Sequence, residues 1–484
     1  MLSGNLVIDA PTATHNSQTA DLIDEPRHFS VDELFFSTTD LKGRILKGNS
    51  VFRRISGYSW DELKNKPHNI IRHPDVPRIV FKALWDTIQA GRPIVAYVKN
   101  LAKDRRYYWV VAMVVPISDG YLSVRFKPTS PLFATVKGLY TELRAAEASI
   151  EIETKDKKAA MAASGQMLTA TLEKLGFSSY EDFMQEMLKQ ELQSRETHLR
   201  NFTHSTDASD SLMAPDQSSE IAPVRTAAQL FDALLEVLRA LFHDLESYVS
   251  VNKGVREKSE NVTETAESLR VLALNGAIEA DRLGANAVGL RPVLDWLRSF
   301  SAGITKEVAR LTASLVELTR DVDRVVFDLS AAKLQIEMTA LFAHELVELA
   351  VRSGSTEVDQ GMQGAIDCLY NSSHETVSRA LSNLAAIKNR LKGLTESQAK
   401  LLESSHFLRP LYLKGKVEMA DGAGPKLEVV FSDARGHLDE TVLNLRGLKS
   451  LLGELETLLI RGLDYGKRID EINSQIESVL PSIA

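Results

Sequence analysis

Two hydrophobic patterns meet near Pro131. Before it, short apolar runs are separated by Gly, Pro and Asn, whereas after it long stretches repeat their apolar positions every three or four residues. In the first part, the pattern predicts an amphipathic helix over residues 76–89 and strands over 94–100, 107–117 and 121–127. Small helices followed by antiparallel strands are typical of an α+β domain.

The part after Pro131 is predicted to form long helices. Apolar residues step by three or four from Leu230 to Leu245 and from Phe300 to Leu329, which is the spacing of a coiled-coil or bundle seam. A helix over residues 296–349 would be about 80 Å long. Such a rod must pair with the preceding helix, with another protomer, or with both. The expected fold is an α+β domain followed by an all-α, long helical or coiled-coil hairpin, mostly helical overall.

Composition narrows the range of partners. The net charge of −8 argues against nucleic acid, because phosphate binding needs concentrated Lys and Arg. The single cysteine, Cys368, allows no intramolecular disulfide and fits a reducing compartment. No apolar run reaches the roughly 18 residues that cross a bilayer. We therefore expect no transmembrane segment and a cytoplasmic protein.

The same patterns divide the chain into six regions. In order they are a disordered N-terminal arm (1–28), a sensor domain (29–130), a helical connector (131–202), a flexible linker (203–223), a helical hairpin with its tip near 281–292 (224–404), and a C-terminal helical region (405–484). The linker is assigned because its residues are polar and rich in Ser and Asp.

The first domain carries a set of specific motifs. The pieces STTDLKGRI, ISGYSWDEL, KPHNIIRHPDVP, LW, VKN and YYWV follow one another through residues 29–130. In this order they resemble the PAS sensor domain of the aerotaxis receptor family, Aer. That resemblance implies non-covalent FAD binding, and it assigns seven cofactor-binding candidates: Arg72, His73, Asp75, Asn49, Phe81, Trp85 and Asn100.

The residue types suit this cofactor. Arg72 can pair with a phosphate through two parallel hydrogen bonds. Phe81 or Trp85 can cover a flat apolar ring, and an Asn amide can reach a polar ring edge. Ile94 departs from the family, which carries a tryptophan there, so one aromatic wall is missing.

Other interpretations of the same residues stay open. Arg72, His73 and Asp75 could form a surface ion-pair and turn network whose backbone is fixed by prolines. His73 could instead be an axial haem ligand, which we regard as a weaker hypothesis than FAD. His68 is expected to be a structural hydrogen-bonding residue.

A second resemblance begins at Glu267. The run ESLRVLALNGAIEADRLGANAVGLRPVLDWLR resembles the hairpin tip of methyl-accepting chemotaxis proteins. This implies a dimer or higher oligomer and contacts with a CheA-type kinase and a CheW-type adaptor, with Asn275, Glu279 and Arg282 as the partner-binding candidates. The chain departs from that family at four positions, namely Ala285, Val288, Arg291 and Pro292. Pro292 disfavours a continuous helix unless it lies in the first turn. The alternative is an ordinary helical hairpin.

The chain lacks a recognisable catalytic motif, a glycine-rich phosphate loop and a paired metal motif. His344 near Glu345 and Glu348 is expected to be a solvated pair rather than a ligand site. We therefore interpret the protein as a redox- or oxygen-sensing signal transducer of the aerotaxis or energy-taxis type, and not as an enzyme. One alternative is a ligand-free PAS scaffold that assembles with a signalling partner outside chemotaxis. A flavin enzyme is the weaker alternative.

Overall fold

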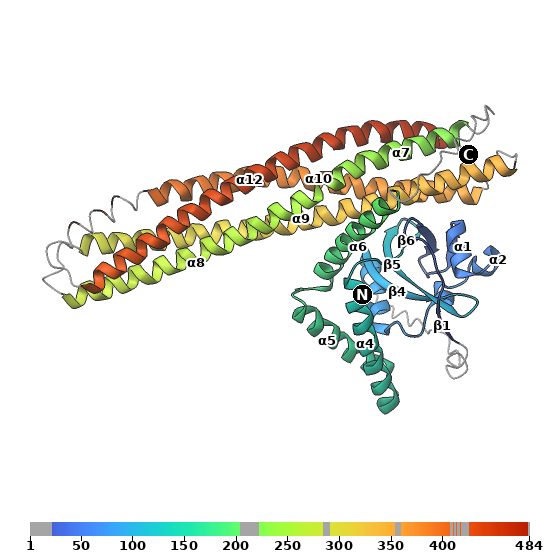
Figure 1. Ribbon diagram of the computed structural model, residues 1–484, viewed down its shortest axis with the longest axis horizontal. Helices are drawn as coiled ribbons and strands as arrows, with labels where there is room; N and C mark the ends of the chain where they lie inside the picture. Colours follow the sequence, from blue (N-terminus) through green and yellow to red (C-terminus); the bar gives the residue numbers. More distant parts are fainter. Residues whose placement is uncertain are drawn as a thin grey trace, which may run out of the picture. The chain divides into compact units, whose positions relative to one another are not determined.

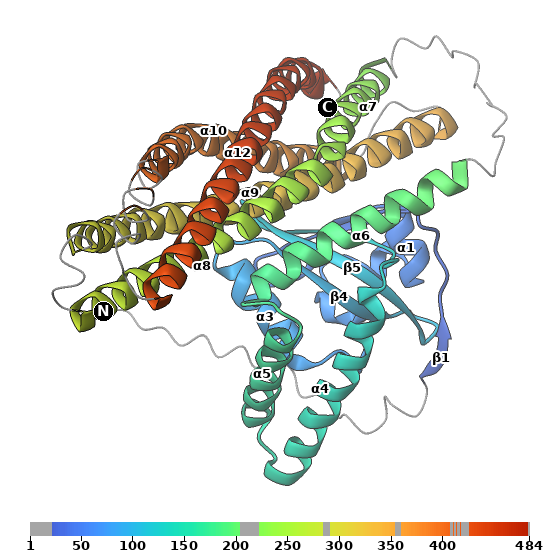
Figure 2. The same cartoon turned by 60° about the vertical axis from the view of Figure 1, so that its left-hand side comes forward.

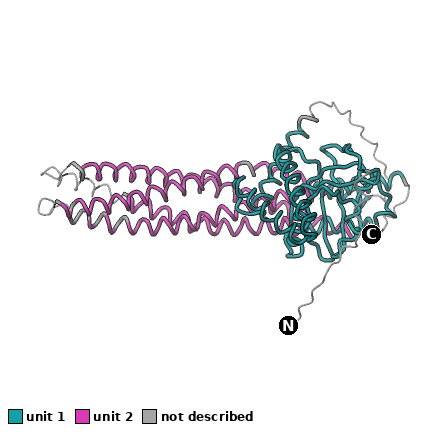
Figure 3. The backbone as a smooth tube through the Cα atoms, turned by 90° about the horizontal axis from the view of Figure 1, so that it is seen from below, with its two compact units in different colours: residues 1–228, 337–372, 482–484 teal, residues 229–336, 373–481 magenta. Residues whose placement is uncertain are grey.

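A computed structural model describes residues 22–203, 222–283, 291–353, 360–406, 410, 413, 417 and 425–482. The chain divides into two compact units, coloured separately in Figure 3. The first comprises residues 1–228, 337–372 and 482–484, and the second comprises 229–336 and 373–481. The predicted linker and hairpin tip fall largely on residues 204–221 and 284–290, which lie outside the described residues.

The first unit is built on a six-stranded sheet. Its strands are β1 (Ile23–Pro26), β2 (Phe35–Asp40), β3 (Ile45–Gly48), β4 (Ile94–Leu101), β5 (Arg106–Ile117) and β6 (Gly120–Phe126). The order is β3-β2-β6-β5-β4, with antiparallel neighbours, and β1 pairs in parallel with the first residues of β5. The last three strands agree with the prediction to within one residue at each end. The arm predicted over residues 1–28 was drawn too long, because β1 is an ordered strand.

Short helices lie on the inner face of the sheet. They are α1 (Ser50–Ser56), α2 (Trp60–Leu63), the 3₁₀ turn η1 (His68–Ile71) and α3 (Arg78–Gln89). Asn49 caps α1 by accepting from the Phe52 backbone N–H, and Ser59 forms a capping box with Glu62 at α2. The RHPDVP segment turns at Pro74 and Asp75, and Pro77 directly precedes the start of α3 at Arg78.

Longer helices cover the outer face. They are α4 (Leu132–Thr154) and α6 (Tyr180–Thr203), and α6 crosses the strands β4 and β5 (Figures 1 and 2). Between them in the chain, α5 (Lys157–Lys174) packs against α4 and α3. The aromatic rings of Tyr97 and Trp109 pack on Phe133 with centroids 5.3 and 5.2 Å apart. Both faces are therefore buried, which explains the nearly unbroken apolar run of β5.

The last part of α9 (Arg291–Ser353) also belongs to the first unit. Phe342 meets Phe36 of β2 edge to face at 5.0 Å, and the Glu345 carboxylate accepts from the Ser50 backbone N–H at 2.9 Å. Glu345 is therefore engaged at the N-terminus of α1, where a negative charge is favourable. The expected solvated pair with His344 does not describe this carboxylate.

The second unit consists of long helices. Besides much of α9 it contains most of α7 (Ala222–His243) and of α10 (Gln360–His406), together with α8 (Leu245–Leu283) and α12 (Pro425–Val479). Every described side chain of the predicted α9 seam is buried: Ile304, Val308, Leu311, Leu315, Leu318, Val322, Val325 and Leu329. The chain continues from Val479 into the short 3₁₀ turn η3 (Leu480–Ser482).

Four of these helices cover one another's apolar faces. The Lys258 ammonium of α8 donates to Asn444 of α12 at 3.1 Å, and Asn252 of α8 donates to Asp323 of α9 at 2.9 Å. Arg379 of α10 pairs with Asp328 of α9 at 3.0 Å. The α9 stripe thus pairs within its own chain.

Two sequence expectations have simple structural outcomes. Pro292 lies in the first turn of α9, where its missing N–H costs no helical hydrogen bond. None of the helices in the described part of the chain has the length and apolar character needed to cross a bilayer.

Candidate functional site

The inner face of the sheet holds three buried polar atoms without a hydrogen-bond partner. They are Nδ2 of Asn100, the hydroxyl of Tyr108 and the hydroxyl of Ser123, whose residues are 3%, 1% and 6% exposed. Asn100 and Tyr108 are direct cross-strand partners. Such groups cost free energy unless something pairs with them, so this face is suited to a polar ligand.

The orientation of these side chains follows from strand alternation. Tyr121 packs on Trp85 of α3 at 5.6 Å, and Arg125 lies over the Phe52 ring of α1 at 5.6 Å. Ser123 lies between them on β6 and must point to the same side. Ala96 and Ala112 are cross-strand partners on the same face. Their small side chains lie between Asn100 and Tyr108 at one end of the face and Ser123 at the other.

Next to these atoms is a polar cluster that is already paired. Arg125 donates to Ser37 at 3.0 Å and contacts Nε2 of His68 at 2.7 Å. Burial, together with the positive charge of Arg125, lowers the pKa of His68 to about 3. Burial also lowers the pKa of Arg125, to about 10. His68 is therefore a neutral acceptor, which confirms its predicted role as a structural hydrogen-bonding residue.

Arg72 follows η1 and makes an isolated bridge to Asn100 through its backbone. Its guanidinium lies 4.0 Å above the Phe81 ring, a cation–π contact. Among the described residues it has no hydrogen-bond acceptor, although burial, followed by repulsion from Arg78, lowers its pKa to about 10. At neutral pH it is a largely enclosed cation without a paired anion.

His73 and Asp75 belong to a different small network. The Nδ1 atom of His73 accepts from the Asp75 backbone N–H at 3.2 Å, and the Asp75 carboxylate pairs with Lys99 at 2.6 Å. Burial, together with the positive charge of Lys99, lowers the pKa of His73 to about 4. The Asp75 side chain is 58% exposed. The predicted ion-pair and turn network is therefore present for these two residues, but Arg72 is not part of it.

The remaining cofactor candidates differ in whether their side chains are already engaged by other protein groups. Asn49 is committed to the protein, because its amide accepts from Phe52 and Phe36 N–H groups and donates to the Leu34 carbonyl. Trp85 is only partly buried and meets Tyr121 edge to face. Ile94 is fully buried on the inner face, on the same side of β4 as Asn100.

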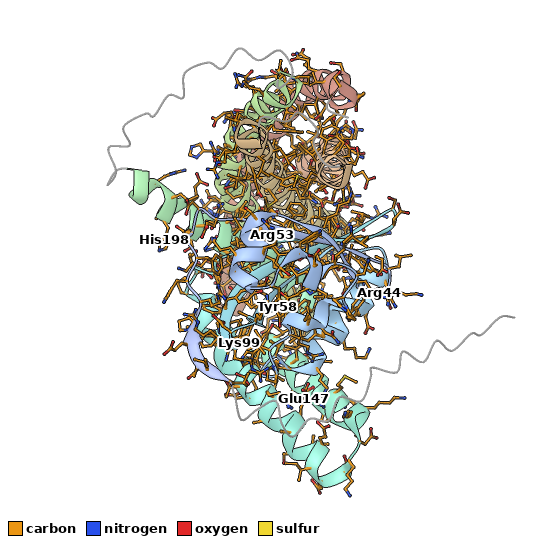
Figure 4. The ribbon with its side chains drawn as sticks, turned by 90° about the vertical axis from the view of Figure 1, so that its right-hand side faces the viewer. Arg44, Arg53, Tyr58, Lys99, Glu147 and His198 are labelled. Carbon is orange, nitrogen blue, oxygen red and sulfur yellow. The ribbon has the colours of Figure 1, made fainter. Side chains whose placement is uncertain are left out.

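Two charged residues of α4 approach the motif and were missed from the sequence. Glu147 is fully buried and accepts from the backbone N–H groups of Arg78 and Ile79 at 2.9 and 3.1 Å, capping α3. Arg144 donates from Nε to the Pro74 carbonyl at 3.1 Å. Figure 4 labels Glu147 on α4. Glu147 follows Leu139 and Leu143 at helical spacing on the buried stripe of α4, and this spacing is the sequence signal that could have predicted its burial.

The outer face also buries charge, but there it is paired. Glu191 of α6 accepts from the Tyr97 hydroxyl at 2.6 Å, from the Thr129 backbone N–H at 2.7 Å and from the Ser130 hydroxyl at 2.8 Å. Arg195, one turn later, donates two hydrogen bonds to Glu337 of α9 at 2.8 and 2.9 Å. This bidentate pair is buried and joins α6 to α9 within the first unit.

The partner-binding candidates lie on the last turns of α8. Glu279 and Arg282 form an ion pair at 3.3 Å, and Asn275 is exposed. Leu274 and Ile278, on the same helix, are 48% and 46% exposed. The two side chains are four residues apart and therefore lie on the same face of α8. No group of potential metal ligands occurs in the described residues.

Comparison with known proteins supports the fold of the first domain. Residues 45–124 match the PAS fold family. The Escherichia coli aerotaxis receptor is 40% identical over 126 residues, a quarter of this chain and a quarter of that protein. The nitrogen fixation regulatory protein of Klebsiella pneumoniae is 28% identical over 81 residues, 17% of this chain and 16% of that one.

The solved structures include a PAS domain of a Colwellia psychrerythraea protein. It is 22% identical, covers 19% of this chain and 85% of its own, and has a TM-score of 0.17. The chain therefore contains a PAS domain similar to that of an aerotaxis receptor, and it spans only a quarter of that receptor's length. The named relatives are a receptor and a regulatory protein.

Proposed function

We propose that residues 29–130 bind FAD between the inner face of the sheet and α3, and that the protein is a redox- or oxygen-sensing signal transducer. The observation that carries the proposal is the trio of buried, unpaired polar atoms on Asn100, Tyr108 and Ser123. Together they offer one amide donor and two hydroxyls to a single ligand. The resemblance of the RHPD segment to aerotaxis receptors makes a flavin the favoured ligand.

The residues present fit such a group. Asn100 and Tyr108 would bind polar groups of the ligand at one end of the face, where Arg72 would face the phosphates. Ser123 would bind at the other end, where Trp85 would lie against the apolar surface of the ring. A flavin supplies reversible transfer of electrons and protons. What the chain supplies is position: buried donors respond to a change in charge or protonation beside them, and two packed arrangements are then favoured differently.

The chain also offers a route from the site to the helices of the first unit. Glu147 caps α3, and the Tyr97 hydroxyl joins β4 to Glu191 of α6. The Arg195–Glu337 pair joins α6 to α9. We infer that a shift of α3 or β4 alters these contacts and thereby biases α9.

A CheA-type kinase and a CheW-type adaptor are the proposed partners. Support comes from the exposed residues Leu274, Asn275 and Ile278 on α8, within the segment that resembles chemotaxis proteins. Affinity capture with purified kinase and adaptor, comparing the wild type with Ile278→Glu, tests this part. Equal capture of both would remove the α8 surface from the proposal.

The visible absorption spectrum of the purified protein, before and after reduction, tests the cofactor. We expect a flavin spectrum in the wild type and its loss in Asn100→Leu, which keeps the shape but removes the donor. Asn69→Leu changes an exposed asparagine and is the matched control. Colourless wild type that cannot be reconstituted with FAD overturns the proposal and favours a ligand-free PAS scaffold.

A further inference from the structure

A cluster of arginine side chains lies where α4 meets the RHPD segment. Three guanidinium groups, those of Arg72, Arg78 and Arg144, interact electrostatically there. Two carboxylates are nearby, but both have other roles. Glu151 forms two hydrogen bonds with Arg78, at 2.5 and 3.3 Å, and Glu147 is used by the N-terminus of α3. Three guanidinium groups against two carboxylates leave one positive charge unbalanced, and Arg72 is the arginine of the three that forms no ion pair in the described structure.

The Arg144 side chain is anchored but incompletely paired. Its Nε atom donates to the Pro74 carbonyl at 3.1 Å, which fixes the guanidinium beside the segment that carries Arg72. Its Nη1 atom is buried and forms no hydrogen bond, since the nearest carboxylate oxygen, on Glu147, is 4.0 Å away. A buried donor without an acceptor, next to the unpaired cation Arg72, is the arrangement that an anion would complete.

We propose that Arg144 of α4, together with Arg72, forms a phosphate-binding subsite for the pyrophosphate of the dinucleotide. The proposal rests on the proposed function, because the anion is taken to be part of FAD. It extends the site beyond the PAS domain, since Arg144 lies outside both the predicted sensor domain and the family match. A ligand held by both arginines would connect the motif to the first helix of the connector.

The chemistry of the two groups suits a phosphate. Two guanidinium groups present planar donor pairs that match phosphate oxygens bidentately. The Phe81 ring under Arg72 holds its guanidinium plane in place. Arg78 already pairs with Glu151 through both Nη atoms, so its charge is balanced within the protein.

The test compares two flavins that differ in their phosphates. Binding of FAD and of riboflavin to the full chain is measured by flavin fluorescence, for the wild type, Arg144→Gln, Arg144→Lys and the control Arg53→Gln. Arg53 is exposed on α1, and no side-chain bond is formed by it in the described structure. Circular dichroism of each flavin-free variant checks that the fold is kept.

We expect Arg144→Gln to weaken FAD binding by about 10- to 100-fold, the loss typical of a charge-assisted hydrogen bond, and to leave riboflavin binding unchanged. Arg144→Lys should recover part of the FAD affinity, since it keeps the charge but not the planar fork. Arg53→Gln should change neither affinity.

The possible outcomes separate this proposal from the preceding one. If the wild type binds neither flavin, the proposed function fails and takes the subsite with it. If it binds both flavins and Arg144→Gln weakens them equally, the arginine acts only by positioning Pro74, and the subsite is wrong while the cofactor proposal stands.

Discussion

The inner and outer faces of the PAS sheet bury similar polar groups in different states. On the outer face, Glu191 accepts hydrogen bonds from three residues, and Arg195 is paired twice with Glu337. On the inner face, Asn100 and Tyr108 each leave a donor unused. A buried network in which every polar group is hydrogen-bonded favours one arrangement, whereas buried polar groups without partners are stabilised when a ligand pairs with them. The outer face is therefore built for attachment to the chain's own helices and the inner face for a ligand.

Breaking the outer face should have the largest effect. Arg195→Ala leaves Glu337 with an uncompensated buried charge, so we expect the free energy of unfolding to fall by about 3–5 kcal/mol. Urea denaturation measures it. Replacing both partners, with Arg195→Met and Glu337→Leu, should recover most of the loss. The exposed pair Arg92–Glu181 is the control, because Arg92→Ala should cost only about 0–1 kcal/mol. A loss of only about 0–1 kcal/mol for Arg195→Ala would mean that the Arg195–Glu337 pair contributes little to holding α6 against α9.

Acid should act mainly on the inner face. The folded-state pKa of His68 is lowered to about 3, below its unfolded value, so the unfolded chain binds the proton first. Stability is then complete above about pH 6.5 and falls as the pH is lowered toward 3, with a slope of up to about 1.4 kcal/mol per pH unit for this one proton. His73, whose pKa is lowered to about 4, adds a second proton over much of the same range.

The variant His68→Gln keeps an acceptor for Arg125 but removes the titrating ring. Its urea denaturation midpoint should depend less steeply on pH between 6.5 and 4 than that of the wild type. His198→Gln, at an exposed position labelled in Figure 4, should leave the slope unchanged. An unaltered slope in His68→Gln would show that its ring does not titrate in this way.

A pair of tyrosine substitutions gives the smallest effect and the sharpest comparison. Tyr97→Phe removes a hydroxyl that donates to Glu191, so it should cost about 1–3 kcal/mol. Tyr108→Phe removes a hydroxyl with no partner, so without flavin the stability should be unchanged or slightly higher. Thermal melting of the flavin-free protein measures both. Equal losses of stability for the two substitutions would contradict the difference between a hydrogen-bonded hydroxyl on the outer face and a hydroxyl without a partner on the inner face.

The sequence predicted the elements better than it predicted their contacts. Strands β4 to β6 were placed to within one residue because their apolar runs are bounded by turns. Strand β1 was missed because IDEP lacks a strand pattern, and its pairing with β5 supplies the stability. The seam of α9 was predicted because its spacing repeats without interruption, but which helices cover it depends on tertiary packing.

The candidate site was predicted in part. The RHPD motif located Arg72, but the sequence did not show that its guanidinium lacks an acceptor while Asp75 is paired with Lys99. Glu147 and Glu191 were missed because charged residues in helices are usually solvated. Both lie in phase with leucines on a buried stripe, and a lone charge in such a phase is a usable signal for a buried cap or network.

The long helices of the second unit have a consequence for symmetry. In a bundle assembled from identical chains, each layer repeats the same residues, and a substitution appears in every copy at once. Here α8, α9, α10 and α12 belong to one chain, so each layer of the seam is free to differ on its four sides. Dilution does not separate these helices, because their closure is intramolecular. A single substitution therefore changes one helix alone. The other three helices keep their own residues at that layer and respond to the change from one side only.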